Sequence, residues 1–245
     1  RSDAEAIVFL QTAEVMESEE IPGTSSRPLK LVLEKDGVRA RAIFRTVDVE
    51  RAKMDHVREH ARGFRDHYVY EVAAYQLSRL LGLDNVPPAT LRTLDGVEGS
   101  IQLWVESAQG IQDRLDDGID ERHQQLWLLQ RQNMAVFDNL IYNFDRNPGN
   151  MLLDSRGKVW FVDHTRAFKI LPALNGRGEI KVVERELWQN LRELDSELVR
   201  ERLGPYLKAT EIDALLARRD KLVKLIAKRI ARHGERAILF EFVRS

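Results

Sequence analysis

Three polar residues in the middle of the chain have the order and spacing that transfer of a phosphoryl group requires. Asp145 is followed by Asn150, and a second carboxylate, Asp163, comes after a short intervening segment. One carboxylate can accept the proton of an attacking hydroxyl, while an amide oxygen and a second carboxylate hold divalent metal on ATP. Hard oxygen ligands of this kind suit Mg²⁺ or Mn²⁺. The spacing therefore predicts Asp145 as a base and Asn150 and Asp163 as metal ligands.

The residues between Asn150 and Asp163 predict a hairpin that gathers these groups. Two short apolar runs, 151–153 and 159–162, flank a turn-forming segment at 154–157. A hairpin of this length brings its two ends together around one metal and phosphate cluster. A surface loop with solvated acids, followed by an ordinary hairpin, is the alternative that the pattern leaves open.

The same segment resembles that of a known family. Residues 143–146, Asn150 and the pair 162–163 are similar to the catalytic segment in the atypical branch of the protein-kinase-like fold. That branch includes type II phosphatidylinositol 4-kinases, the HipA toxin kinases and the secretory-pathway kinases. A second likeness covers 70–83 and the following 86–88, where such kinases have a glutamate-bearing helix that leads into a valine-proline strand. The resemblance extends from about residue 22 to about residue 168.

Two departures from the typical kinase pattern accompany the resemblance. Asn143-Phe144-Asp145 stands in place of His-Arg-Asp, and Asp163-His164-Thr165 stands in place of Asp-Phe-Gly. The resemblance implies an α+β fold with two lobes, a small sheet lobe and a larger helical lobe. The corresponding division is 1–105 for the nucleotide-covering lobe and 106–245 for the helical lobe that carries the catalytic loop and the metal-binding hairpin.

The resemblance also implies roles for residues outside the hairpin. Arg45 occupies the place where kinases carry the phosphate-binding lysine, and Glu71 is expected to point toward it. Arginine grips phosphate through a planar fork, so its geometry differs from that of lysine. Leu103 and Val105 are expected in the hinge between the lobes, where backbone groups meet adenine. Arg146 is expected to steady either the phosphoryl group or the catalytic loop.

A turn near the N-terminus is a candidate phosphate-binding loop. Gly23, Thr24 and Ser25 precede two apolar runs, 29–33 and 38–44, that a Lys-Asp-Gly turn joins into a predicted hairpin. Backbone N–H groups and hydroxyls in such a turn can approach ATP phosphates. A plain surface turn is equally compatible with this composition.

Helical periodicity accounts for most of the remaining chain. A helix is predicted from Asp66, as its N-terminal cap, to residue 81, with Gly82 as its stop. Further helices are predicted at 120–143, 184–194, 196–203 and 210–232, and Thr210 with Asp213 has the spacing of a capping pattern. The segment 218–232 is predicted to have a basic exposed face, which is either solvated or a docking site for an acidic partner or lipid headgroup.

Composition narrows the class of protein. The 245 residues carry a net charge of −1, which argues against general attraction to nucleic acid or acidic membranes. The absence of cysteine excludes disulfides and thiolate metal sites. No apolar run approaches the length of a membrane span. The expectation is a soluble protein of unknown compartment, either cytoplasmic or exported after leader removal, because the chain starts at Arg1 without Met and a leader could have been removed. The oligomeric state stays open.

The function predicted from these observations is an ATP-dependent kinase acting on a hydroxyl of a protein, lipid, sugar or small molecule. Arg45 and Thr165, which replaces the usual glycine, keep open a pseudokinase that binds nucleotide without turnover. A third reading is a zinc peptidase, because His56, Glu59 and His60 match the H-x-x-E-H pattern. The highly charged segment around that match lacks the apolar face of a buried zinc helix.

Overall fold

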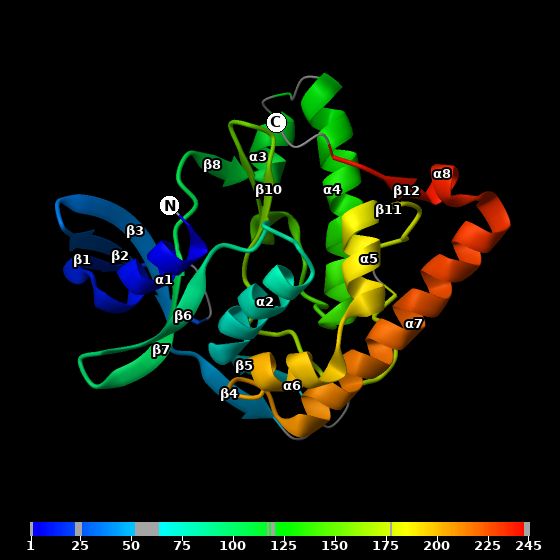
Figure 1. The fold of residues 1–245 in the computed structure, drawn as a ribbon. Coiled ribbons are helices and arrows are strands. Elements are labelled where there is room, and N and C mark those ends of the chain that lie inside the picture. Colours follow the sequence, from blue (N-terminus) through cyan, green and yellow to red (C-terminus); the bar gives the residue numbers. More distant parts are fainter. Residues whose placement is uncertain are drawn as a thin grey trace.

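The computed structural model describes residues 2–22, 26–51, 64–116, 118, 121–176 and 178–242, but not the side chains of Arg51, Phe64, Leu115, Glu121 and Arg122. A sheet lies on one side of the molecule and a group of helices on the other, with one helix, α2, between them (Figure 1). In the described part of the chain, no helix combines the length and apolar character that crossing a membrane would need.

The sheet is antiparallel and has five strands in the order β1-β2-β3-β7-β6. Helix α1 covers it, and Phe9 and Leu10 of this helix share a core with Leu31, Phe44 and Ile101 of the strands. The hairpin predicted at 29–33 and 38–44 is confirmed as β2 and β3, so Arg45 stands at the end of a buried strand. The bounds of these elements are α1 Asp3–Thr12, β1 Glu14–Glu20, β2 Leu29–Lys35, β3 Val38–Arg45, β6 Ala89–Leu94 and β7 Val97–Leu103.

Helix α2 (Val69–Leu80) confirms the predicted helix, and Gly82, whose φ of 70° few other residues adopt, follows shortly after its end. The prediction that Asp66 caps this helix is wrong. Asp66 lies in the short strand β5 (Phe64–His67), which pairs with β4 (Asp48–Arg51), and its backbone is therefore extended. The helix begins after Tyr68 without a side-chain cap.

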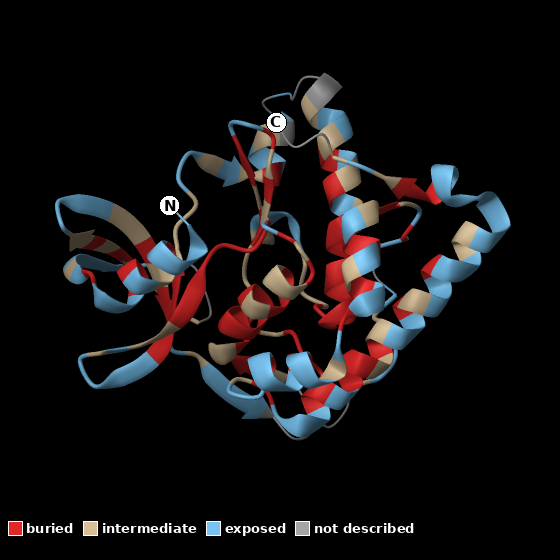
Figure 2. Ribbon diagram, viewed as in Figure 1, coloured by how far each residue is buried: buried red, intermediate tan, exposed pale blue. Residues whose placement is uncertain are grey.

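The helices pack around a second and larger core (Figure 2), to which α4, α5 and α7 contribute their buried faces. The helix predicted at 210–232 is confirmed as α7, but its predicted capping pattern is wrong. The helix begins one residue earlier, and the Glu211 carboxylate accepts from the Lys208 N–H at 2.7 Å. The bounds are α3 Ile111–Asp116, α4 Glu121–Leu140, α5 Arg185–Glu193, α6 Ser196–Leu203, α7 Ala209–His233, α8 Glu235–Ile238, β11 Val183–Glu184 and β12 Leu239–Phe240.

The hairpin predicted between Asn150 and Asp163 is present. Strands β9 (Met151–Asp154) and β10 (Val159–Phe161) pair antiparallel, and β8 (Ala108–Gly110) adds a third strand beside β9. A short 3-10 turn, η2 (Pro148–Asn150), leads into β9. The Val162 N–H donates to the Asn150 carbonyl at 3.3 Å, so the two ends of the hairpin lie side by side.

The predicted exposed basic face of 218–232 is wrong at Arg218, which is fully buried. Its guanidinium donates to the carbonyls of Leu140 (2.7 Å), Lys169 (2.8 Å) and Leu171, and so ties α7 to the segments around the end of α4. Burial lowers the pKa of Arg218 to about 10.

Replacing Arg218 by methionine is expected to destabilise the fold by about 3 kcal/mol or more. Three carbonyls would lose their donor, and each buried group left without a partner costs roughly 1–3 kcal/mol. Urea unfolding of Arg218→Met beside Lys228→Met, a change of the same type at an exposed position of α7, measures the difference. Equal stability of the two variants would contradict this role for Arg218.

Candidate active site

A cavity of about 410 Å³ is lined both by the sheet and by the segments that carry the predicted catalytic residues. Asp145, Asn150 and Asp163 contribute one part of its wall, and Arg45 at the end of β3 contributes another. Residues separated by more than a hundred positions are thus gathered around one space. The tertiary structure brings together what the sequence predicted to act together.

Asp145 lies in the loop between α4 and β9, called here the Asp145 loop (residues 141–150). Its N–H donates to Asn143 Oδ1 at 3.1 Å, and Asn143 Nδ2 donates to Asp138 Oδ1 at 3.1 Å. Asn143 and Asp138 are buried, so a rigid polar base supports the backbone of Asp145. The side chain of Asp145 is 37% exposed and can meet a substrate hydroxyl.

Asn150 and Asp163 stand at the open end of the β9–β10 hairpin. Asn150 Nδ2 donates to the Asp145 carbonyl at 3.1 Å, which leaves its amide oxygen as the atom that can face a cation. Asp163 has a φ of 60°, a backbone conformation that aspartate tolerates better than most residues, and its Oδ1 accepts from Thr165 at 3.2 Å. The hairpin therefore places two oxygen donors close to Asp145.

Arg45 and Glu71 form a buried ion pair across the cavity wall, as the resemblance implied, with Arg45 Nε 3.7 Å from Glu71 Oε1. Burial alone would raise the pKa of Glu71, but the charge of Arg45 and hydrogen bonds from His164 outweigh it and hold that pKa at about 2. Glu71 is therefore ionised. Arg45 lines the cavity, and its Nη1 is buried and has no hydrogen-bond partner among the described residues.

The predicted hinge also borders the cavity. Leu103 and Val105 line it, with Gln102 and Trp104 beside them. The Leu103 N–H donates to the Pro88 carbonyl at 2.9 Å, and the Trp104 N–H donates to the Arg41 carbonyl at 2.9 Å, so this strand end is held on both sides.

The predicted phosphate-binding turn cannot be placed. Gly23, Thr24 and Ser25 lie outside the described residues, although Ile21 and Ser26 on either side of them line the cavity. The segment with His56, Glu59 and His60 also lies outside the described residues.

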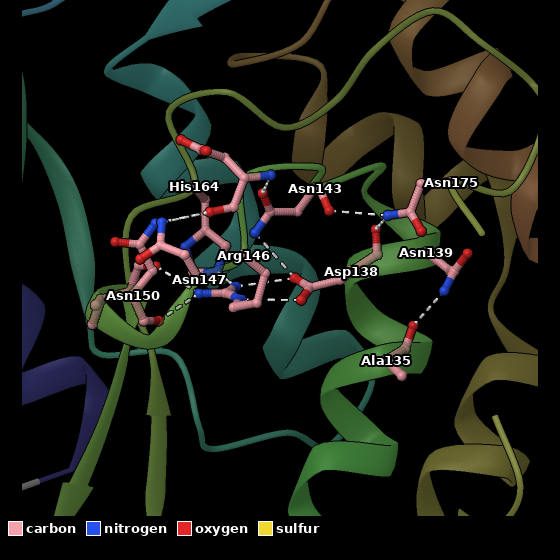
Figure 3. A network of polar contacts seen from close by, with 11 residues as sticks. Ala135, Asp138, Asn139, Asn143, Arg146, Asn147, Asn150, His164 and Asn175 are labelled. Atoms are coloured by element: carbon pink, nitrogen blue, oxygen red, sulfur yellow. Dashed lines mark hydrogen bonds and ion pairs between the residues drawn. The ribbon is translucent and has the colours of Figure 1, made fainter. Parts of the chain in front are cut away.

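Arg146 is not among the described residues that line the cavity, and its side chain faces the interior behind the Asp145 loop (Figure 3). It forms a two-bond ion pair with Asp138 at 3.0 Å and 3.0 Å. It also donates to the carbonyls of Asn150 (2.6 Å) and Val162 (2.7 Å), which join the loop to the end of the hairpin. These contacts suit the loop-steadying role and not a contact with a phosphoryl group.

Two further charged residues of the site escaped the sequence analysis. Arg166 donates to Asp145 Oδ2 at 2.9 Å and to Asp66 Oδ2 at 2.8 Å, and all three side chains line the cavity. Asp66 is buried, and its Oδ1 has no hydrogen-bond partner among the described residues. The only sequence signal for Arg166 is its position three residues after Asp163.

The donor set of the cavity fits a hard divalent cation. Asn150, Asp163 and the buried carboxylate of Asp66 offer oxygen atoms, which Mg²⁺ and Mn²⁺ prefer. Within the described part of the chain, no three acidic or histidine side chains are clustered closely enough to hold a metal unaided.

Solved structures of other proteins have a similar fold. The chain is similar to hydra Fam20 with sugar, at 16% identity and a TM-score of 0.75, over 99% of this chain and 94% of that chain. It is similar to the Golgi casein kinase at 15% identity and a TM-score of 0.65, over 97% of this chain and 78% of that chain. The Golgi casein kinase with Mn/ADP bound gives 15% identity and a TM-score of 0.65, over 99% and 80%.

No protein-family model and no curated protein matches the chain. At these identities the similar structures establish the fold, and they confirm the α+β class with a sheet part and a helical part. The chain therefore has the atypical protein-kinase-like fold that its sequence resemblance predicted, in the form seen in these kinases.

Proposed function

We propose that this chain is an ATP-dependent kinase that transfers the γ-phosphoryl group to a hydroxyl acceptor. One observation carries the proposal: a single cavity is lined by the buried Arg45, whose Nη1 has no hydrogen-bond partner among the described residues, and by the oxygen-bearing side chains of Asp145, Asn150 and Asp163. Arg45 supplies the cation for phosphate, Asn150 and Asp163 supply metal ligands, and Asp145 supplies the base.

Nucleotide binding is assigned to the sheet side of the cavity. Arg45, braced by Glu71, engages the α- and β-phosphates through its fork of N–H groups. The hinge backbone at Leu103 and Val105 contacts the adenine, and the turn at Gly23, Thr24 and Ser25 covers the phosphates. We also propose that the chain divides between residues 105 and 106 into a nucleotide-covering lobe and a helical lobe.

Metal binding is assigned to the oxygen donors opposite. Asn150 and Asp163 hold Mg²⁺ or Mn²⁺, and Asp66 is a third candidate because its buried Oδ1 needs a partner. The bound metal would neutralise charge on the phosphates and fix their orientation. The Golgi casein kinase, one of the similar structures, has been solved with Mn/ADP bound, which supports this choice of nucleotide and metal.

The reaction step requires little of the protein beyond position and one proton acceptor. Asp145 accepts the proton of the acceptor hydroxyl, whose oxygen bonds to the γ-phosphorus as the bond to the bridging oxygen of ADP breaks. Arg166 holds Asp145 Oδ2, which leaves Oδ1 to receive that proton. Arg146 steadies the Asp145 loop from behind.

Transfer of label from γ-labelled ATP tests the proposal. The chain is incubated with Mg²⁺ or Mn²⁺ and with acceptors of four classes, namely proteins, lipids, sugars and small alcohols. We expect label on at least one class and loss of γ-phosphate from ATP. A wild-type chain that neither binds metal–ATP nor releases γ-phosphate would refute the kinase.

A pseudokinase is the second candidate, favoured by Arg45 in the place of lysine and by Thr165 in the place of glycine. Its signature is a thermal shift with Mg·ATP without loss of γ-phosphate on any acceptor. Bound-zinc analysis tests the peptidase reading of His56, Glu59 and His60 separately.

Replacing Arg45 by lysine is expected to keep or raise activity, whereas Arg45→Ala is expected to lose about tenfold or more. Either cation can pair with Glu71 and with phosphate, but alanine leaves a buried carboxylate near the phosphates without its counter-charge. Turnover at saturating ATP is compared for these variants, Glu71→Gln and the exposed control Arg39→Ala on the same strand. If Arg45→Ala and Glu71→Gln both match the control, the sheet side is not arranged as proposed.

A further inference from the structure

A chain of buried polar side chains crosses from the phosphate-binding side of the cavity to the helix that supports the Asp145 loop. It runs from Arg45 through Glu71, His164 and Arg146 to Asp138, and every member is buried or nearly so. Its links are an ion pair at 3.7 Å, hydrogen-bonding contacts at 3.1 Å and 3.1 Å, and a final ion pair at 3.0 Å. Only the first member lines the cavity.

We infer that His164 is a positioning residue that couples the nucleotide-binding arginine Arg45 to the Asp145 loop. The inference rests on the proposed function and deepens it, because it assigns the residue through which ATP binding and the catalytic base influence each other.

The contacts of His164 fix which ring nitrogen carries the proton. Arg146 can only donate, so His164 Nε2, 3.1 Å from its guanidinium, must accept. The proton is therefore on Nδ1, which donates to Glu71 Oε2 at 3.1 Å. The backbone N–H of His164 donates to the other oxygen, Glu71 Oε1, at 2.9 Å. One residue thus holds both oxygens of the glutamate that braces Arg45.

The same position in the typical kinase triplet is a phenylalanine, which can make neither side-chain hydrogen bond. In this chain the ring of His164 also packs edge-on against Phe137 of α4, at 5.9 Å between ring centroids. The ring of His164 therefore packs against Phe137 and also makes side-chain hydrogen bonds with Glu71 and Arg146. Phenylalanine would fill the space but break the chain of contacts between Glu71 and Arg146.

Arg146 and Asp138, at the end of the polar network opposite Arg45, contact the segments that carry the proposed catalytic residues. Arg146 donates to the carbonyls of Asn150 and Val162, which adjoin the proposed metal ligands (Figure 3). Asp138, its partner, also accepts from Asn143, which holds the backbone N–H of Asp145. In a buried network with few alternative partners, a shift at one member moves the others. Binding at Arg45 and the position of Asp145 are consequently linked through His164.

The test is a double-mutant cycle between Arg45 and Asp138, the first and last residues of the polar network. Neither residue contacts His164 directly. Arg45→Ala and Asp138→Asn are made singly and together, and the affinity for Mg·ATP is measured by calorimetry. In the wild-type background we expect Asp138→Asn, although remote from the cavity, to weaken ATP binding. We also expect the double variant to depart from the product of the single effects by about threefold or more, as residues in one network do.

The cycle is then repeated in two variants of the connecting residue. In His164→Phe the effects of the Arg45 and Asp138 substitutions should become independent. His164→Gln should keep much of the coupling, since glutamine has an NH₂ group that can donate and a carbonyl oxygen that can accept. Gln130→Met is the matched control, because Gln130 is buried on α4 and braces the same hairpin through Val159 without joining the network. It should lower stability and leave ATP affinity unchanged.

The outcomes separate the inference from the proposed function. The inference would be overturned if the effects of the Arg45 and Asp138 substitutions on Mg·ATP affinity were independent with His164 present. Coupling that is unchanged in His164→Phe would also overturn it. Neither result would contradict ATP binding or turnover. A wild-type chain that binds no Mg·ATP would refute the proposed function instead. In that case the double-mutant cycle of Arg45 and Asp138 is measured by urea unfolding. Additive effects of the two substitutions on the free energy of unfolding would overturn the inferred coupling.

Discussion

Replacement of Asp145 by asparagine is expected to lower the rate of phosphoryl transfer by about a hundredfold or more, the usual scale for one acid–base group. A base acts on the acceptor hydroxyl in the transition state and not on bound ATP, so the affinity for Mg·ATP should change little. Asparagine keeps the shape of aspartate and can still accept from Arg166, so the loop should stay in place. Turnover at saturating ATP and calorimetric ATP affinity are measured on the same preparation.

The matched control for this change is Asp95→Asn, at an exposed turn between β6 and β7. It alters the same functional group far from the cavity and should behave as wild type. Turnover in Asp145→Asn equal to that of Asp95→Asn would remove Asp145 from the catalytic role.

Replacement of Asp163 is expected to abolish the metal-dependent gain in thermal stability with ATP. ATP should bind weakly without divalent metal, because few other groups of the cavity can offset the charge of the triphosphate. Asp163→Ala removes one of two predicted metal ligands, and melting curves with ATP, with and without Mg²⁺ or Mn²⁺, show the loss. An unchanged metal response in this variant would count against the site.

The backbone at position 163 requires a second variant. Its φ of 60° costs alanine roughly 1–2 kcal/mol, which would lower stability for a reason unrelated to metal. Asparagine tolerates that conformation and removes only the charge, so Asp163→Asn should lose most of the metal response at near wild-type stability. Asp220→Ala, an exposed aspartate on α7, controls for the loss of one negative charge.

The loop and hairpin that carry the predicted catalytic residues could be predicted from the sequence because their geometry is local. Asp145, Asn150 and Asp163 belong to one loop and one hairpin, and antiparallel pairing of β9 with β10 necessarily returns the chain to its starting edge. The same holds for the β2–β3 hairpin, which sets Arg45 at a strand end, and for α2, whose apolar period and terminal Gly82 fix its face and its end.

The burial and the interaction partners of individual charged side chains could not be predicted from the local sequence. Asp66 looks like a helix cap and Arg218 looks like a solvated helix residue, because the local sequence shows charge but not burial. Arg166, the partner of Asp66, is 100 positions away, and Leu140, which accepts from Arg218, is 78 positions away. A buried charge is stable only with partners, and partners at such separations are chosen by the packing of whole elements.

For Arg146, the local sequence predicted part of the role and the tertiary structure decided the rest. Its type and place beside Asp145 suggested a role in the site, and the sequence left open whether it meets the phosphoryl group or the loop. The direction of its side chain depends on Asp138 and His164, which approach from two other elements. The roles of Asp145, Asn150, Asp163 and Arg45, and the division at 105/106, remain predictions.

The sequence by itself determined the order of the predicted catalytic groups and the hairpin that joins them, since these follow from spacing and periodicity within short segments. The kinase-like class of the fold came from the resemblance of those segments to a known family. Only the tertiary structure decided that Arg45 Nη1 is buried without a hydrogen-bond partner among the described residues, that Asp66 and Arg166 line the same cavity as Asp145, and that His164 contacts both Glu71 and Arg146. The physical reason is that hydrogen-bond partners and burial are properties of packed surfaces, which bring together segments that no local pattern connects.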